Sequence, residues 1–220
     1  MLRAGGLDAM AARAGAHVQL WSEAERADSL AATLAAHPDP SAIRDGGVWL
    51  LAYGSLLWNP TVEVAERRRV RVPGWQRRFC LTARAGRGTA DHPGLLLGLI
   101  EGEAVDGMAL RIEAASLLDE LALLWRREML TGSYVPRWLP AEDGLPVLAF
   151  TMDPTSRGYA GNLDEDAVVA CLSTARGELG TCAEYLFQTE AALGATGIAD
   201  PAISRLAARV RCRLQEPRPA

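Results

Sequence analysis

The amino-acid sequence predicts an α+β fold in which short strands come first and most helices are collected late in the chain. Short apolar segments bounded by Gly and Pro recur over residues 48–112, as in the strands of a barrel or a curled sheet. Segments with helical apolar spacing, separated by glycines, fill the last third of the chain. With 220 residues, 49% hydrophobic and 23% charged, the chain can bury the core of one substantial domain.

The N-terminal region is predicted to lie outside the main domain. Its first residues are rich in Ala and Gly and little there could pack, so we expect a flexible extension over residues 1–21. A helix is expected over residues 22–36, ended by Pro38, and we assign residues 22–46 to this accessory helical element. The main domain is then expected over residues 47–215.

Seven strands are expected in the main domain. The first, over residues 48–53, is a continuous apolar run closed by Gly54. Pairs such as Pro73-Gly74, Pro93-Gly94 and Asp106-Gly107 are expected as turns between the next four. The remaining strands are expected over residues 68–72, 77–83, 95–101, 108–112, 134–139 and 146–152.

A helix is expected over residues 116–130, between the fifth and sixth strands. Ser116 can act as its N-cap with Asp119 in the third position, and Thr131-Gly132 supplies the stop. Further helices, punctuated by glycines, are expected over residues 164–176, 184–193 and 200–213.

The charge balance argues against a nucleic-acid partner. The formal net charge is −4 and the isoelectric point is near 5.5, whereas nucleic-acid binders usually carry a basic surplus. One arginine-rich stretch alternates with Val70 and Val72, which describes the solvent-exposed face of sheet strands. Its members are Arg67, Arg68, Arg69, Arg71, Arg77 and Arg78.

Cysteine usage and hydropathy predict a cytoplasmic protein. The four cysteines are widely scattered without a C-x-x-C pair, which fits buried thiols in a reducing compartment. Charged residues interrupt the N-terminal segment, so it lacks the apolar core of a signal peptide. No apolar run approaches the ~20 residues that a membrane helix requires.

Glu128 is the most informative single position, because it continues the apolar stripe of the helix over residues 116–130. Burying a carboxylate is unfavourable unless a partner or a function retains it, and desolvation raises its pKa towards that of a general base. The alternatives, that Glu128 bonds a core arginine or closes the helix end, stay open. The stripe comprises Leu117, Leu118, Leu121, Leu124 and Trp125, while Asp119, Glu120, Arg126 and Arg127 fall off it.

The turn Tyr53-Gly54-Ser55-Leu56 is the second candidate. A buried strand ends there in a glycine turn, which could present consecutive backbone N–H groups and a hydroxyl to an anionic ligand. So short a motif also fits an ordinary strand-to-loop turn.

Together with their flanks, these two elements resemble the ChaC family of γ-glutamylcyclotransferases. The resemblance extends over residues 49–210, and an ordered series of motifs is far more specific than any one of them. The matching segments are 51–60 (LAYGSLLWNP), 74–80 (GWQRRFC), 87–89 (RGT), 93–95 (PGL), 124–132 (LWRREMLTG), 134–138 (YVPRW), 159–161 (YAG) and 184–186 (EYL).

The resemblance implies a small β-barrel flanked by helices, with Tyr53, Gly54, Ser55 and Leu56 as substrate loop and Glu128 as catalytic base. The implied reaction converts glutathione to 5-oxoproline and cysteinylglycine, with no metal or cofactor. Glu128 would take a proton from the attacking α-amine and return it to the leaving amine. Tyr159, which follows Gly158 in a glycine-flanked loop, would close over the substrate.

Two other functions are compatible with the same residues. The enzyme could act on other γ-glutamyl amines or amino acids, or the chain could be a non-catalytic γ-glutamyl sensor, against which the presence of Glu128 argues. For a serine or cysteine hydrolase, Ser55 lacks the G-x-S-x-G frame and the histidines stand in no recognisable partnership. A metal site is disfavoured because neither His nor Cys has ligand spacing.

Overall fold

The computed structural model describes residues 20–216, so nearly all of the extension expected over residues 1–21 lies outside the described residues. The chain then runs through α2 (Glu23–Ala35), α3 (Pro40–Gly46), β1 (Val48–Ala52), η2 (Ser55–Leu57), β2 (Glu66–Ala83), β3 (Gly94–Ile112), η3 (Ala114–Ser116), α4 (Leu117–Glu128), β4 (Tyr134–Pro140), β5 (Pro146–Met152), α5 (Glu165–Thr174), β6 (Arg176–Gly177), β7 (Gly180–Thr181), α6 (Cys182–Ala195) and α7 (Pro201–Gln215).

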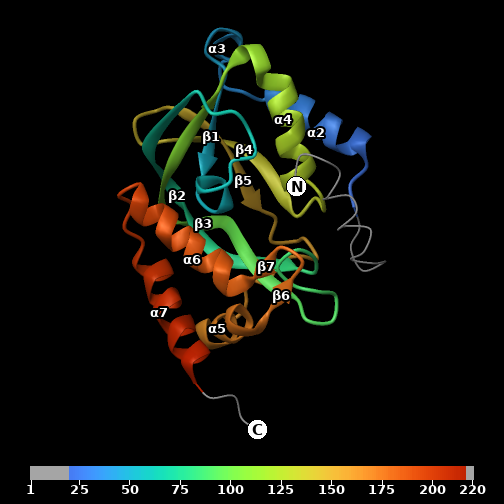
Figure 1. Ribbon diagram of the computed structural model, residues 1–220. Coiled ribbons are helices and arrows are strands. Elements are labelled where there is room, and N and C mark those ends of the chain that lie inside the picture. The colour runs from blue at the N-terminus through green and yellow to red at the C-terminus, as the bar shows by residue number, and fades with distance from the viewer. Residues whose placement is uncertain (1–19, 217–220) are drawn as a thin grey trace.

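The main sheet is mixed, with the strand order β2-β3-β1-β5-β4. Its pairs are antiparallel except that β5 runs parallel to both β1 and β3. The C-terminal end of β3 pairs with β1. The middle of β3 also pairs with β5, where Leu99 lies opposite Thr151. Because β3 meets both strands, the sheet curls into a half-barrel (Figure 1). The expected α+β class and the curled sheet are confirmed.

Two long strands replace four of the expected short ones. β2 and β3 pair along almost their whole length, so residues 68–72 and 77–83 form one strand and residues 95–101 and 108–112 form another. Pro73-Gly74 lies at a β-bulge, with Gly74 at φ +81°, and Asp106-Gly107 lies inside β3 opposite Arg71 and Val70. Predicting turns there was wrong, because a bulge lets a strand bend without ending the ladder.

The helices form two groups on the sheet (Figure 1). α2 packs on α4, and α5, α6 and α7 pack on one another. Indole N–H groups help to fix α2: Trp125 Nε1 donates to Ser29 Oγ over 3.2 Å, and Trp138 Nε1 donates to the Thr33 carbonyl over 2.7 Å. The expected helices are confirmed, whereas α3 and the β6–β7 hairpin were not predicted. Ser116 is the N-cap residue of α4, but its side chain makes no capping hydrogen bond.

The buried face of α4 differs in part from the expected stripe. Leu118 is 64% exposed, whereas Glu120 is buried. Glu120 Oε2 accepts a hydrogen bond from the Glu63 N–H over 3.0 Å, so a loop backbone satisfies this carboxylate. The prediction that Leu118 belongs to the stripe and Glu120 does not was therefore wrong.

Arg77 departs from the solvent-exposed face expected for the β2 arginines, because its side chain is only 3% exposed. The bulges in β2 shift the alternation, so that Val72 and Phe79, two buried residues seven positions apart, share the inner face with Arg77. Its Nε lies 3.1 Å from Asp200 Oδ2, and its Nη1 donates to the Tyr53 carbonyl over 3.0 Å.

Asp200 serves two elements at once. It caps α7 by accepting from the Ile203 N–H over 3.0 Å, and it pairs with buried Arg77. We expect Asp200→Asn to lower the free energy of unfolding by about 2–3 kcal/mol, since Asn keeps the cap but leaves a buried cation without its counter-charge. Urea unfolding would measure the difference.

The matched control for this prediction is Asp164→Asn. Asp164 caps α5 through the Ala167 N–H over 2.8 Å but is exposed, so the change is expected within about 0.5 kcal/mol of zero. Equal effects at the two caps would mean that the ion pair contributes little.

Candidate active site

Glu128 is the last residue of α4 and its side chain is 13% exposed. Burial raises the pKa of the carboxyl, and the neighbouring Arg127 guanidinium acts against that rise. Arg127 Nε lies 3.0 Å from Glu128 Oε1, but the pair lacks hydrogen-bond geometry, and Oε1 is buried without a hydrogen-bond partner among residues 20–216. A helix C-terminus also disfavours a negative charge. The alternative that Glu128 bonds a core arginine is therefore met in part, by an ion pair with Arg127 that leaves Oε1 without a hydrogen bond.

Three tyrosines interact electrostatically with the negative charge of Glu128. Burial raises the pKa of Tyr53, Tyr134 and Tyr185, that of Tyr185 to about 12, and the Glu128 charge adds to the rise in each case. The Tyr53 hydroxyl donates to the Phe150 carbonyl over 2.7 Å, and the Tyr134 hydroxyl donates to the Leu97 carbonyl over 2.8 Å. The hydroxyls of Tyr53 and Tyr134 are thus fixed to backbone carbonyls.

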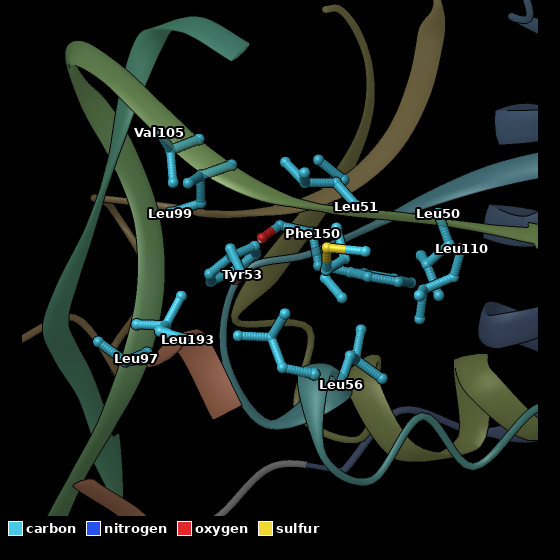
Figure 2. Packing of buried hydrophobic residues seen from close by; sticks show 14 of the residues in the cluster. Leu50, Leu51, Tyr53, Leu56, Leu97, Leu99, Val105, Leu110, Phe150 and Leu193 are labelled. Atoms are coloured by element: carbon cyan, nitrogen blue, oxygen red, sulfur yellow. The ribbon is translucent and has the colours of Figure 1, made fainter. Parts of the chain in front are cut away.

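The turn after β1 contains four of the predicted substrate residues. Its hydrogen bonds begin with the Leu57 N–H, which donates to the Gly54 carbonyl over 3.0 Å, and the first N–H groups of such a turn have no intrahelical acceptor. A Cβ on Gly54 would lie 3.2 Å from the Tyr185 hydroxyl, so the absence of a side chain allows this close approach. Tyr53 and Leu56 point into the core (Figure 2). The side chain of Leu56 is therefore unavailable to a ligand, whereas its backbone remains available.

Arg127 joins the turn to the helix end, and sequence reasoning missed it. Its Nη2 donates to Ser55 Oγ over 2.6 Å, and its Nη1 donates to the Asn59 carbonyl over 2.5 Å. The side chain is 12% exposed, which corrects its placement off the buried stripe. Because Arg127 contacts both Glu128 and Ser55, the structure brings these two predicted residues together.

Tyr159 lies in a loop beside β2, where it forms an isolated bridge with Leu81. Its loop is fixed to β2, since the Thr82 N–H donates to the Gly158 carbonyl over 2.8 Å and the Ala160 N–H donates to the Cys80 carbonyl over 2.7 Å. Across residues 20–216, no hydrogen bond or ring contact connects Tyr159 with Glu128 or with the turn. The predicted closure of Tyr159 over a substrate remains a prediction.

Within residues 20–216, no group of three or more His, Cys, Asp and Glu side chains is arranged to hold a metal ion. No helix in the described part of the chain has the length and apolar character needed to cross a membrane.

Comparisons with known proteins agree with the fold and the motifs. A family model described as ChaC-like protein matches residues 48–213. Glutathione-specific gamma-glutamylcyclotransferase of Escherichia coli (strain K12) is 43% identical over 90% of this chain and 85% of its own length. Glutathione-specific gamma-glutamylcyclotransferase 1 of Homo sapiens is 30% identical over 68% of this chain and 69% of its own length.

A solved structure extends the comparison to the fold. The crystal structure of a gamma-glutamyl cyclotransferase specific to glutathione from yeast matches with a TM-score of 0.69 and 18% identity, covering 76% of this chain and 97% of that one. At this identity the likeness concerns the fold alone. From the family model and the sequence identities, the chain belongs to the ChaC-like family.

Proposed function

We propose that this protein is a cytoplasmic glutathione-specific γ-glutamylcyclotransferase, which converts glutathione to 5-oxoproline and L-cysteinylglycine. The observation that carries the proposal is the Glu128 carboxylate, whose Oε1 is buried without a hydrogen-bond partner and is paired with the arginine that holds Ser55. The names of the Escherichia coli and human relatives support the choice of glutathione.

Glu128 acts as base and then as acid in the proposed reaction. The substrate α-amine is mostly ammonium at neutral pH, so it must lose a proton before it attacks the γ-carbonyl carbon. Glu128 accepts this proton, the new C–N bond closes a five-membered lactam, and the old amide C–N bond breaks. The same carboxyl then returns the proton to the leaving amine of cysteinylglycine. Its raised pKa suits both transfers.

The turn of Gly54, Ser55 and Leu56 holds the substrate in the proposed mechanism. Its backbone N–H groups donate to the α-carboxylate and to the oxyanion that develops on the γ-carbonyl oxygen. Since nucleophile and electrophile belong to one molecule, the main task of the protein is to fold the γ-glutamyl chain into attack geometry. The reaction consumes no water, which is compatible with so buried a carboxylate.

Replacing the base tests the mechanism directly. We expect Glu128→Gln to lower kcat by at least about 10²-fold while glutathione still binds, because the amide cannot accept the proton. Formation of 5-oxoproline from glutathione and, separately, from γ-glutamyl-alanine would be followed by mass spectrometry, and binding by calorimetry. Undiminished turnover in the variant would remove Glu128 from the mechanism. Turnover of γ-glutamyl-alanine would show that the enzyme also accepts alanine as the leaving amine.

The raised pKa of Glu128 also predicts how stability depends on pH. The folded protein binds this proton more tightly than the unfolded chain, so the stabilisation is complete in acid and is lost as pH rises from about 4.5 through the folded pKa. At neutral pH the charged group is therefore unfavourable. We expect Glu128→Gln to raise Tm by a few degrees at pH 7, with a gain that shrinks towards pH 4.

Thermal unfolding at a series of pH values would measure this gain. Glu120→Gln is the matched control, because Glu120 is buried on the same helix but its carboxylate accepts a hydrogen bond. A lower Tm of Glu128→Gln at pH 7 would show that pairing with Arg127 outweighs desolvation.

A further inference from the structure

Arg127 has no role in the reaction as proposed above, yet it contacts more parts of the site than any other side chain described there. We infer that Arg127 is a positioning residue, which locks the Glu128 carboxylate, the Ser55 hydroxyl and the loop after η2 into one arrangement before substrate arrives. This inference rests on the proposed function and adds a residue to the machinery of the same site.

The guanidinium uses all three of its nitrogens on separate parts of the site. Nε faces Glu128 Oε1 at 3.0 Å, Nη2 donates to Ser55 Oγ over 2.6 Å, and Nη1 donates to the Asn59 carbonyl over 2.5 Å. Nη1 also donates to Thr61 Oγ1. A planar fork of five N–H donors can serve such divergent partners, whereas the single ammonium of lysine cannot reproduce this geometry.

The loop that Arg127 holds is strained. Thr61 has φ +67° and is the one non-glycine residue with positive φ in the range 20–216. For a β-branched residue this conformation costs roughly 1–3 kcal/mol and persists only where the surroundings enforce it. Arg127 bonds both the Thr61 hydroxyl and the Asn59 carbonyl, and Glu120 fixes the Glu63 N–H from the same helix. α4 thus holds the loop at three points.

Arg127 also sets the electrostatics of the base. Among the described ionisable groups, Arg127 is the one that shifts the pKa of Glu128, whereas the Glu128 charge acts on the phenols of Tyr53, Tyr134 and Tyr185. The three phenols, whose pKa values are raised, are neutral at physiological pH. The Arg127 cation is therefore the group that opposes the rise of the Glu128 pKa caused by burial.

The test compares the pH profiles of kcat and KM for Arg127→Met and Arg127→Lys with that of the natural protein, using glutathione. Without the cation the pKa of Glu128 rises further, so we expect the acid limb of the Arg127→Met profile to move to higher pH. Its kcat at neutral pH should fall about 10²-fold and recover in part in alkali. Arg127→Lys keeps the charge but not the fork, so its limb should stay near the natural position while kcat falls about tenfold.

The control is Arg205→Met, which removes one positive charge from a side chain of α7 that is 57% exposed and pairs with Glu165 of α5, in the helix group that does not contain Arg127. Its profile should superimpose on that of the natural protein. A loss of kcat in Arg127→Met that is equal at every pH, or a rise of KM alone, would overturn the positioning role. The first would indicate only a structural role, and the second direct substrate binding.

A second readout is independent of turnover. The side-chain carboxyl ¹³C signal of Glu128, assigned by its absence in Glu128→Gln, would be titrated in each folded variant. A higher midpoint in Arg127→Met without any 5-oxoproline from the natural protein would uphold the arrangement and overturn the proposed function. Turnover with an unmoved midpoint and limb would overturn the positioning role. If Arg127→Met does not fold, a natural kcat and midpoint in Arg127→Lys would overturn it as well.

Discussion

The site depends on one electrostatic constraint, the burial of the Glu128 carboxylate at the C-terminal end of α4 without a hydrogen bond to satisfy it. Desolvation and the negative end of the helix dipole both disfavour the charged form. The surrounding tyrosine hydroxyls do not relieve it, because those of Tyr53 and Tyr134 donate to backbone carbonyls instead. Arg127 is the group that limits this destabilisation, and it does so from the adjacent position in the chain.

Two arginines hold the turn after β1. Arg77 bonds the Tyr53 carbonyl at one end of the turn, and Arg127 bonds Ser55 and Asn59 further along. Arg77 is itself fixed by Asp200 at the start of α7. Both helix groups therefore contribute to the position of a segment that the β1 strand alone would leave free to bend.

The sequence predicted local elements well where periodicity is unbroken, and less well where a bulge changes the alternation. The strand of residues 48–53, the helix ending at Glu128 and the late helices follow from apolar spacing and glycine stops. The bulges of β2 reverse the inward and outward faces, so Arg77 could not be recognised as buried from the pattern of Val70 and Val72. Long-range pairing of β2 with β3 likewise leaves no mark in the composition of either strand.

The candidate site was predictable only as far as its two separate motifs. Glu128 departs from an apolar stripe and the turn follows a buried strand, so each has a local signal. The contact that unites them has none, because Arg127 reaches Ser55 across 72 positions of the chain. The buried charge of Glu128 and the backbone strain at Thr61 are both unfavourable for folding. The Arg127 guanidinium contacts both residues. Functional sites retain such conflicts, so these two conflicts support the proposed position of the active site.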